Sequence, residues 1–598
     1  MSRFPVKPFI VFCVIASLLF YHFHGLSSTS PNSKADLDAA YLTFGSPGST
    51  SGQNQKHPIE LLAEHGRRRF DHMVASQSKS LEQAIATYKK RYHREPPPGF
   101  DDWYHLAVAA NATVIDEYDS VTAMFEPYWS ISARELRARV REVVDPEFID
   151  GKMLGIRVKD HQISTLNDKT GVNPYHTDIL KNRMEFFLQY LPDMELAVNP
   201  FDQPSVYPPH DVLSKAVKTC SVPEGGSDDP WEISTRSPRH IYYNYLGFER
   251  TWEIATLSCP LDSPARSDTS SQPLRMTSTD EEPEELQFPR NISSLKNICE
   301  MPEVGDIHGL FLSPGPFWTT TTLVPVFSRA KISTNQDLIT PATDYSKTSQ
   351  YKPYNEEEDM PWDEKENRLY WVGGTTDGSW HDDRFWRRGQ RYRLVRDLNN
   401  GSKPITLYQQ NDSGAWKAYR STMRSLSKYI HVKFNALDHC QPDKLCDNIK
   451  DPEEGVAFSS QKETYQDSYG SKFSFDIDGA SYTERFQRLL HSHNTVFKTT
   501  IFQEWHDDFL IPWVHYVPVT LGMKELPETL RFFAETEKGQ ELGKAIAEDG
   551  RRWAQQAWRP VDMKLALFRI LLEYARLWAP ERDRTGECPW DRTGGVRG

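Results

Sequence analysis

The sequence has no excess of positive charge and no closely spaced cysteine pair, and each absence excludes a class of protein. Its 598 residues contain 70 Lys and Arg against 83 Asp and Glu, which gives a formal net charge of −13. General nucleic-acid binding needs a basic surface, so we expect no nucleic-acid partner. The seven cysteines form no C-x-x-C pair, which argues against a structural zinc site.

The amino-terminal apolar run, residues 9 to about 23, lacks a clear small-x-small cleavage motif after it. A cleaved signal peptide is the alternative, but we expect residues 1–24 to be a cytosolic tail and an uncleaved signal anchor. Arg3 and Lys7 precede the run, and positive charge there places the body in the lumen. We therefore expect a single-pass type II protein of the Golgi or endoplasmic reticulum membrane. The short span suits a thin early-secretory membrane.

Six cysteines follow this run, and an even number in an oxidising lumen predicts disulfide bonds. We expect Cys440 and Cys446 to form a local pair. The pairing of the others stays open: Cys220, Cys259, Cys299 and Cys588. Four N-x-S/T sequences would be glycosylation acceptors in a lumenal protein: Asn111, Asn291, Asn400 and Asn411.

Composition and pattern divide the chain beyond residue 24 into three parts. Residues 25–56 are rich in Ser, Gly, Pro and Asn, which predicts a flexible stem. Residues 57–335 are expected to form a helical and α/β region with a low-complexity insertion near 262–288. Residues 336–598 are expected to form a second α/β region and the carboxy-terminal helices. Strands alternate with helices there, which predicts a mostly parallel sheet covered by helices.

Two groups of carboxylates are candidates for chemistry. Asp116, Glu117 and Asp119 fall in an expected helical stretch over residues 103 to about 129, where a solvated helix face is the more common explanation. Asp476 and Asp478 have the D-x-D spacing with which some enzymes hold a divalent cation on a diphosphate. An ordinary buried strand that ends with Asp478 as a helix cap explains the pattern as well.

A strand, a small-residue loop and a basic segment follow one another between residues 369 and 393. An apolar strand over 369–372 ends at Gly373-Gly374 and is followed by five arginines within a dozen residues. Glycines let the backbone approach a phosphate, and Arg fits phosphate oxygens with a fork of donors. A turn followed by a solvated basic helix is the competing interpretation. The arginines are Arg384, Arg387, Arg388, Arg391 and Arg393.

The same order of strand, small loop and helix recurs at residues 473–490. Arg485 falls in the first turn of that helix, where main-chain N–H groups and an Arg make an anion site. Earlier in the chain, Asp202 follows a strand expected over 194–198. Ligands of open α/β sheets bind beyond the carboxyl ends of strands, although an Asp in a turn often only shapes the turn.

Seven segments in order together resemble the capsule-associated glycosyltransferase family (glycosyltransferase family 90), in its fungal branch. That family includes capsule xylosyltransferases and, more distantly, animal protein O-glucosyltransferases. The resemblance covers roughly residues 85 to 560. The segments are RYHREPPPGFDDWYHLA (91–107), DEYDSVTAMFEPYW (116–129), MELAVNPFDQP (194–204), LVPVFSRAKIS (323–333), PWDEKENRLYWVGGTTDG (361–378), DGASYTERFQRLLHS (478–492) and EWHDDFLIPWVHYVPV (504–519).

The resemblance implies a GT-B fold, in which two Rossmann-like domains face a cleft, with residues 57–335 on the acceptor side and 336–598 on the donor side. It implies an inverting enzyme that transfers a sugar from a UDP-sugar without a cofactor or bound metal. Xylose and glucose are both candidate sugars, and the partner would be a glycan or glycoprotein acceptor. A non-catalytic lumenal protein that binds carbohydrate or nucleotide sugar with the same fold is the alternative.

The resemblance also assigns roles to residues. Asp202 would be the general base that deprotonates the acceptor hydroxyl, and Arg485 would contact the diphosphate. Glu504 would face the ribose or be structural. Val372 stands where relatives often have Arg, and Asp377 where Gly often follows the Thr. The implied donor-binding residues are Trp371, Gly373, Gly374, Thr375, Thr376, Arg391, Arg393, Gly479, Ala480, Ser481, Tyr482 and Arg485.

Overall fold

The computed structural model describes residues 41–42, 56–144, 153–166, 175–217, 219–221, 228–233, 244–245, 251–267, 285–290, 292–315, 317–345, 354–461, 463–585 and 588. The expected anchor within residues 1–24 lies outside these ranges, as do most of the expected stem and residues 268–284 of the expected insertion. Within the described ranges, no helix combines the length and the apolarity that crossing a bilayer requires. Two of the stem residues form strand β1 (Tyr41–Leu42), which pairs with β6 (Phe288–Pro289).

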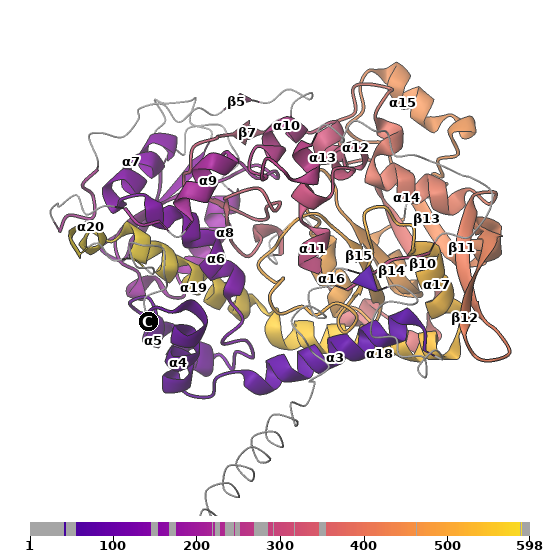
Figure 1. Cartoon of the computed structure of the whole chain (residues 1–598), viewed down its shortest axis with the longest axis horizontal. Helices are drawn as coiled ribbons and strands as arrows, with labels where there is room; N and C mark the ends of the chain where they lie inside the picture. Colours follow the sequence, from indigo (N-terminus) through magenta and orange to yellow (C-terminus); the bar gives the residue numbers. More distant parts are fainter. Residues whose placement is uncertain are drawn as a thin grey trace, which may run out of the picture.

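A five-stranded parallel sheet organises the second half of the chain, as expected from the alternating pattern (Figure 1). The spatial order is β13-β10-β14-β15-β16, so the first strand lies between the second and the third. Ligands of such sheets bind where the strand order reverses, here between β10 and β14. The strands are β10 (Glu366–Gly374), β13 (Ile430–Ala436), β14 (Ser471–Ile477), β15 (Thr495–Thr499) and β16 (Val517–Pro518).

A second five-stranded sheet, of mixed direction, organises the first half. Its order is β3-β2-β4-β8-β9; β4, β8 and β9 run parallel, and β2 is antiparallel to both of its neighbours. Every residue of β4 is buried, which explains why all of its residues except Glu195 are apolar. The strands are β2 (Leu154–Lys159), β3 (Gln162–Leu166), β4 (Met194–Val198), β8 (Val326–Ser328) and β9 (Leu338–Ile339).

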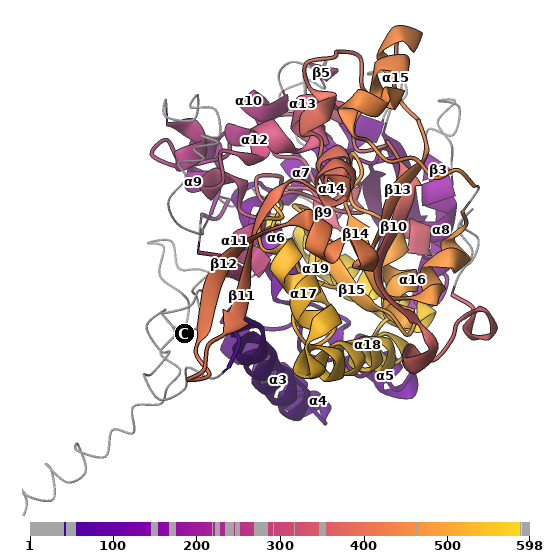
Figure 2. The same ribbon diagram turned by 90° about the vertical axis from the view of Figure 1, so that its right-hand side faces the viewer.

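Helices surround both sheets (Figure 2). The longer ones are α3 (Pro58–Ser76), α4 (Leu81–Tyr92), α5 (Phe100–Ala109), α7 (Ala133–Val144), α8 (Tyr175–Met184), α14 (Gln390–Asn399), α17 (Leu526–Glu535), α18 (Glu537–Ala557) and α19 (Pro560–Trp578). The shorter ones include α6 (Asp119–Phe125), α9 (His210–Ala216), α10 (Thr251–Thr256), α11 (Ile292–Leu295), α12 (Val304–Ile307), α13 (Gly309–Leu312), α15 (Asp443–Lys450), α16 (Arg485–His491) and α20 (Glu581–Thr585). Two further strand pairs are β5 (Asn244–Tyr245) with β7 (Trp318–Thr319), and the hairpin of β11 (Pro404–Gln410) and β12 (Trp416–Thr422).

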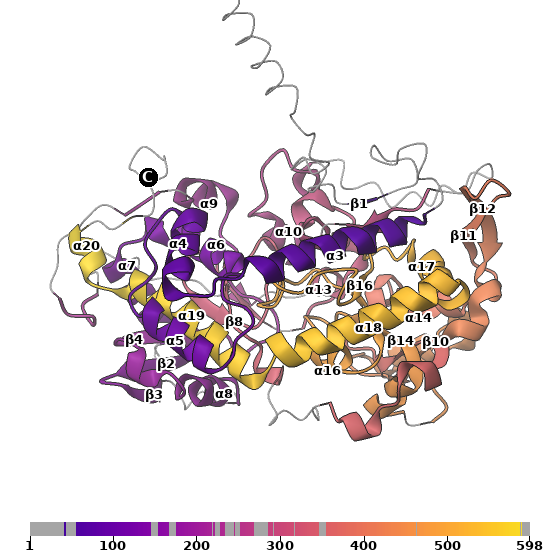
Figure 3. The same cartoon turned by 90° about the horizontal axis from the view of Figure 1, so that it is seen from below.

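Helix α3, near the start of the chain, packs on the parallel sheet of the second half, and α19, near its end, packs on the mixed sheet of the first half. Helix α3 runs beside α18 in Figure 3, and Arg67 of α3 forms an ion pair with Asp549 of α18. The apolar face of α3, including Ile59 and Leu62, belongs to the core of the parallel sheet. Helix α19 instead packs on the mixed sheet, where the Tyr574 hydroxyl donates to the Glu195 carbonyl at 2.7 Å. The helices therefore link the two halves.

The helical stretch expected over residues 103 to about 129 is shorter than its sequence pattern suggested. Ahead of it, α3 ends at Ser76 and the Ser80 side chain caps α4. The stretch from 103 to 129 is divided among α5, α6 and a 3₁₀ turn, η1 (Glu126–Ser130). Asp116 lies between them and accepts hydrogen bonds from the Ser78 main chain and hydroxyl at 2.6 and 3.0 Å. This carboxylate therefore connects two segments of the helical region and does not lie on a solvated helix face.

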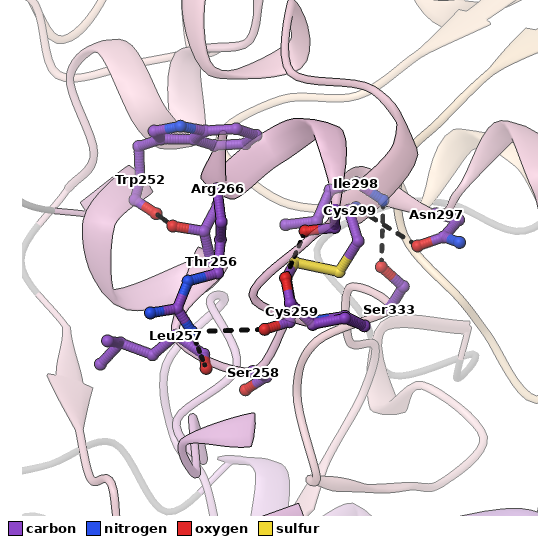
Figure 4. Close-up of a disulfide and its surroundings, with 12 residues drawn as sticks. Trp252, Thr256, Leu257, Ser258, Cys259, Arg266, Asn297, Ile298, Cys299 and Ser333 are labelled. Carbon is purple, nitrogen blue, oxygen red and sulfur yellow. Dashed lines mark hydrogen bonds between the residues drawn. A yellow bond between two sulfur atoms is a disulfide. The ribbon is translucent and has the colours of Figure 1, made fainter. Parts of the chain in front are cut away.

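Three disulfides join the described cysteines: Cys220–Cys588, Cys259–Cys299 and Cys440–Cys446. The last of these confirms the expected local pair. Figure 4 shows the Cys259–Cys299 bond, beside which Arg266 donates to the carbonyls of Leu257 and Cys259 at 3.1 and 3.3 Å. The Cys220–Cys588 bond holds the end of the chain on the first half.

The disulfides should differ in their contribution to stability. Replacing Cys220 and Cys588 together by Ser opens a loop of 368 residues, whereas replacing Cys440 and Cys446 opens one of 6. Because chain entropy released in the unfolded state grows with loop length, we expect losses of about 6 and about 2 kcal/mol in the free energy of unfolding. Urea unfolding followed by tryptophan fluorescence measures both, and an equal or larger loss for the local pair would contradict the prediction.

Candidate functional site

The ends of β10 and β14 meet where the strand order of the parallel sheet reverses. The Ala480 main-chain N–H donates to the Thr376 carbonyl at 2.9 Å and so joins the two loops. Arg391, 4% exposed, donates to the Gly374 and Asp478 carbonyls, each at 3.0 Å, and to the Thr376 hydroxyl at 2.7 Å. The Arg391 guanidinium and the Ala480–Thr376 hydrogen bond therefore hold the two loops together.

The two arginines expected to contact phosphate are used within the protein. Burial, together with the charge of Arg485, lowers the pKa of Arg391 to about 10, and its hydrogen bonds go to the loops themselves. Arg393 donates to the Ile307 and Leu521 carbonyls at 3.1 and 2.9 Å. Both side chains shape the site, and neither presents an unused donor fork to a ligand in this structure.

Arg485 is arranged differently. Its guanidinium lies 5.6 Å from the centre of the Trp371 ring, a cation–π contact. Over the ranges that the structure describes, its side chain donates no hydrogen bond and forms no ion pair. A Cβ added to Gly373 would lie only 3.0 Å from its Nη2 atom, so the missing side chain at Gly373 makes room for it. Arg485 therefore offers a positive charge beside Gly373 that no described carboxylate neutralises.

Thr375 and Asp377 face the interior. The Thr375 hydroxyl donates to the Asp438 carbonyl at 2.6 Å and accepts from its N–H at 2.8 Å. Asp377 is fully buried, and its carboxylate accepts from the Arg391 N–H at 3.0 Å, in the first turn of α14. Burial raises the pKa of Asp377 to about 6, opposed by Arg391. Its negative charge is directed at a helix start, where it is favourable, and away from solvent.

Asp202 follows β4 and stands next to the β14 loop. Its carboxylate is 69% exposed and forms an ion pair with Arg329 at 2.7 Å. Its main-chain carbonyl accepts a hydrogen bond from the Ser481 hydroxyl at 2.7 Å. Ser481 belongs to the loop that carries Gly479 and leads to Arg485. The structure thus brings together the sequence-predicted carboxylate of the first half and the predicted loop of the second.

Sequence reasoning missed the partners that hold this carboxylate. Arg329 follows β8, the neighbour of β4, and also binds Asp344 at 2.8 Å. The Tyr482 hydroxyl donates to Asp344 at 2.5 Å, so this tyrosine, predicted to bind the donor, lies in the same network. The position of Arg329 just beyond a buried strand was a usable signal, because the ends of parallel neighbouring strands meet at one edge of a sheet.

The D-x-D pair and Glu504 are buried among donors. Asp476 accepts from Lys498 at 2.7 Å and Asp478 from the Ile501 N–H at 2.9 Å. Glu504 accepts a hydrogen bond from the Tyr345 hydroxyl at 2.6 Å.

The pKa of Glu504 is lowered to about 2. Burial alone would raise this pKa, but nearby His506 and Lys498 and the hydrogen bond from Tyr345 outweigh it. These contacts favour the structural interpretation of all three carboxylates. Within the described ranges no three His, Cys, Asp or Glu residues cluster as metal ligands.

Comparison with known proteins relates part of the chain to glycosyltransferases. Residues 319–585 match the family described as Glycosyl transferase family 90. The chain is similar to "O-glucosyltransferase rumi homolog" of Aedes aegypti, with 32% identity over 123 residues, 20% of this chain and 29% of the relative. It is similar to "Protein O-glucosyltransferase 1" of Rattus norvegicus, with 22% identity over 282 residues, 44% of this chain and 59% of the relative. The matched parts thus span less than two thirds of these relatives.

The buried Asp377 carboxyl should make stability depend on pH. Its pKa is about 6 in the folded chain against 3.8 ordinarily, so the folded state holds the proton more tightly. Stability from this group is therefore fully present below about pH 4, falls as the pH rises to 6, and stays low above that. The difference corresponds to about 3 kcal/mol.

Asp377→Asn removes this titration while its amide oxygen can still accept from Arg391. We expect the melting temperature of the variant to fall less between pH 5 and pH 7.5 than that of the wild type. Differential scanning fluorimetry across this range measures the change, and parallel profiles for the two proteins would show that the carboxyl does not titrate as described.

Proposed function

We propose, from the premise that the chain carries a glycosyltransferase family 90 domain, that it transfers a sugar from a UDP-sugar to a hydroxyl of a glycan or glycoprotein, with inversion at the anomeric carbon. One observation carries the proposal. The exposed carboxylate of Asp202 and the uncommitted guanidinium of Arg485 flank one loop, and Ser481 of that loop is hydrogen-bonded to Asp202. A base and a cation are the two groups that a single displacement requires.

The reaction assigns each charge to one of these groups. Asp202 accepts the proton of the acceptor hydroxyl while the acceptor oxygen forms a bond to the anomeric carbon. The bond from that carbon to the diphosphate breaks on the opposite side, and UDP leaves with the electron pair. Arg485 offsets the negative charge that develops on the leaving diphosphate. Attack and departure on opposite sides invert the anomeric configuration.

The proposed fold is of the GT-B type, with the mixed sheet as the acceptor-side domain and the parallel sheet as the donor-side domain. The position of Arg485 at the reversal of strand order supports donor binding at the parallel sheet, since nucleotides bind at such positions in doubly wound folds. The proposal uses no cofactor and no bound metal, because Arg485 supplies the positive charge. It leaves Asp476 and Asp478 with the partners described above.

The donor and the compartment are proposed on separate grounds. The relatives' names contain O-glucosyltransferase, which supports glucose, while the resemblance to capsule xylosyltransferases keeps xylose as the other candidate. The name of one relative specifies a protein acceptor. Three disulfides favour an oxidising lumen, and with the apolar run of residues 9–23 they support a type II protein of the Golgi or endoplasmic reticulum.

A donor panel tests the proposal directly. The purified body is incubated with UDP-glucose, UDP-xylose and other UDP-sugars in the presence of a chelator, and UDP release is measured. We expect release with one of the first two sugars and a loss of at least about 100-fold in Asp202→Asn, since general-base catalysis contributes 10² to 10⁴. Release that vanishes with the chelator would contradict the metal-free mechanism.

Binding of UDP tests the donor side independently. Arg485→Ala should weaken UDP binding about tenfold or more by isothermal titration calorimetry, because a charge-assisted contact to phosphate is lost. Arg384→Ala is the matched control, since Arg384 is exposed and paired with Asp382 away from the loops. Unchanged binding in Arg485→Ala would refute its role, and UDP binding without turnover of any sugar would favour the non-catalytic alternative.

A further inference from the structure

The turn that carries Asp202, residues 199–206, is rigid in itself. The Asn199 side chain donates to the Gln203 carbonyl at 2.8 Å and accepts from the Phe201 N–H at 2.9 Å. Asn199 is 2% exposed, so these bonds are shielded from water. These bonds fix the shape of the turn, so the direction of the Asp202 side chain depends on how the turn is attached to its surroundings.

Asp337 fixes the turn to the mixed sheet. It is fully buried, and its carboxylate accepts from the N–H groups of Ser205 and Val206 at 2.9 and 2.8 Å. It also accepts from the hydroxyl of Ser328, the last residue of β8, at 2.6 Å. One carboxylate thus binds two donors of the turn and one of the neighbouring strand.

Ser481 fixes the same turn from the parallel-sheet side. It is 5% exposed, and its hydroxyl donates to the carbonyl of Asp202 at 2.7 Å. A hydroxyl has a single hydrogen, so a Ser481 that donates to Asp202 cannot donate to a phosphate at the same time. The bond connects the donor loop to the main chain of the residue whose carboxylate would accept the proton.

We propose that Asp337 and Ser481 are positioning residues that aim Asp202, the first from the mixed sheet and the second from the donor loop. This inference rests on the proposed role of Asp202 as general base. Neither residue needs to touch the substrate. A base must lie about 2.6–3.2 Å from the proton that it removes, and a misplacement of about 1 Å can cost about 100-fold in rate.

The proposed role of Ser481 predicts an effect on turnover but not on UDP binding. If Ser481 aims Asp202, then Ser481→Ala lowers kcat about tenfold or more, while the Kd for UDP and the KM for the donor change by less than about twofold. If Ser481 were a donor ligand, UDP binding would weaken instead. Ser492→Ala is the matched control, because Ser492 is buried like Ser481 and its hydroxyl also donates to one carbonyl, that of Leu489. We expect its kcat to equal that of the wild type.

Asp337→Asn tests the other side of the turn. The amide can accept only through its one oxygen, so one of the Ser205 and Val206 N–H groups faces an NH₂ group and the turn shifts. We expect kcat to fall about tenfold or more at a temperature where the variant is folded. Asp508→Asn is the matched control, because Asp508 also accepts from a main-chain N–H and a hydroxyl, those of Ser120 at 2.9 and 2.7 Å. If Asp337→Asn does not fold, Ser481→Ala alone decides.

The outcomes also distinguish this inference from the proposed function. Full activity in Asp202→Asn would refute the general-base role and both proposals with it. An inactive Asp202→Asn together with wild-type kcat in Ser481→Ala and Asp337→Asn would overturn the positioning roles only. A tenfold rise in the Kd for UDP with unchanged kcat in Ser481→Ala would also overturn its role. Lower melting temperatures without a change in kcat would show that the two residues are merely structural.

Discussion

The hydrogen bonds from the Arg391 guanidinium to main-chain carbonyls at the ends of β10 and β14 hold the site together. A buried guanidinium is costly unless its donors are satisfied, and here the carbonyls of both strand ends satisfy them. The same contacts fix the separation of the two loops and place Ala480 against Thr376. Arg391 is thus committed to the loops, whereas the Arg485 side chain donates no hydrogen bond among the described residues.

The remainder of the site follows from contacts between loops at the ends of strands of the two sheets. The reversal of strand order places the loops of β10 and β14 side by side, and β4 delivers Asp202 to them. Arg329 joins Asp202 to Asp344, whose other partner is Tyr482 of the β14 loop. Asp202 is thus bound to the first half through its carboxylate and to the β14 loop through its main-chain carbonyl.

Sequence reasoning predicted the parallel sheet, the β4 strand, the local disulfide and the family, because periodicity, small-residue loops and segment order are local signals. It could not assign Arg391 and Arg485 to different tasks, since only tertiary contacts show which guanidinium is already bound. It misjudged Asp116 for the same reason: Ser78, which it binds, lies 38 residues earlier. Asp337 carries no motif, and its importance comes entirely from the turn that packs on it.

Helix α3 packs on the sheet of the second half and α19 on the sheet of the first half, which affects how the chain could be divided into fragments. A cut near residue 335 would leave the first fragment with a helix whose apolar face, including Ile59 and Leu62, belongs elsewhere. The second fragment would carry α19, whose Tyr574 and Trp578 contact the mixed sheet and α7. Neither fragment would be an autonomous folding unit. A minimal half built on the mixed sheet is therefore discontinuous in sequence and needs residues 560–588 supplied in trans or through a new connection.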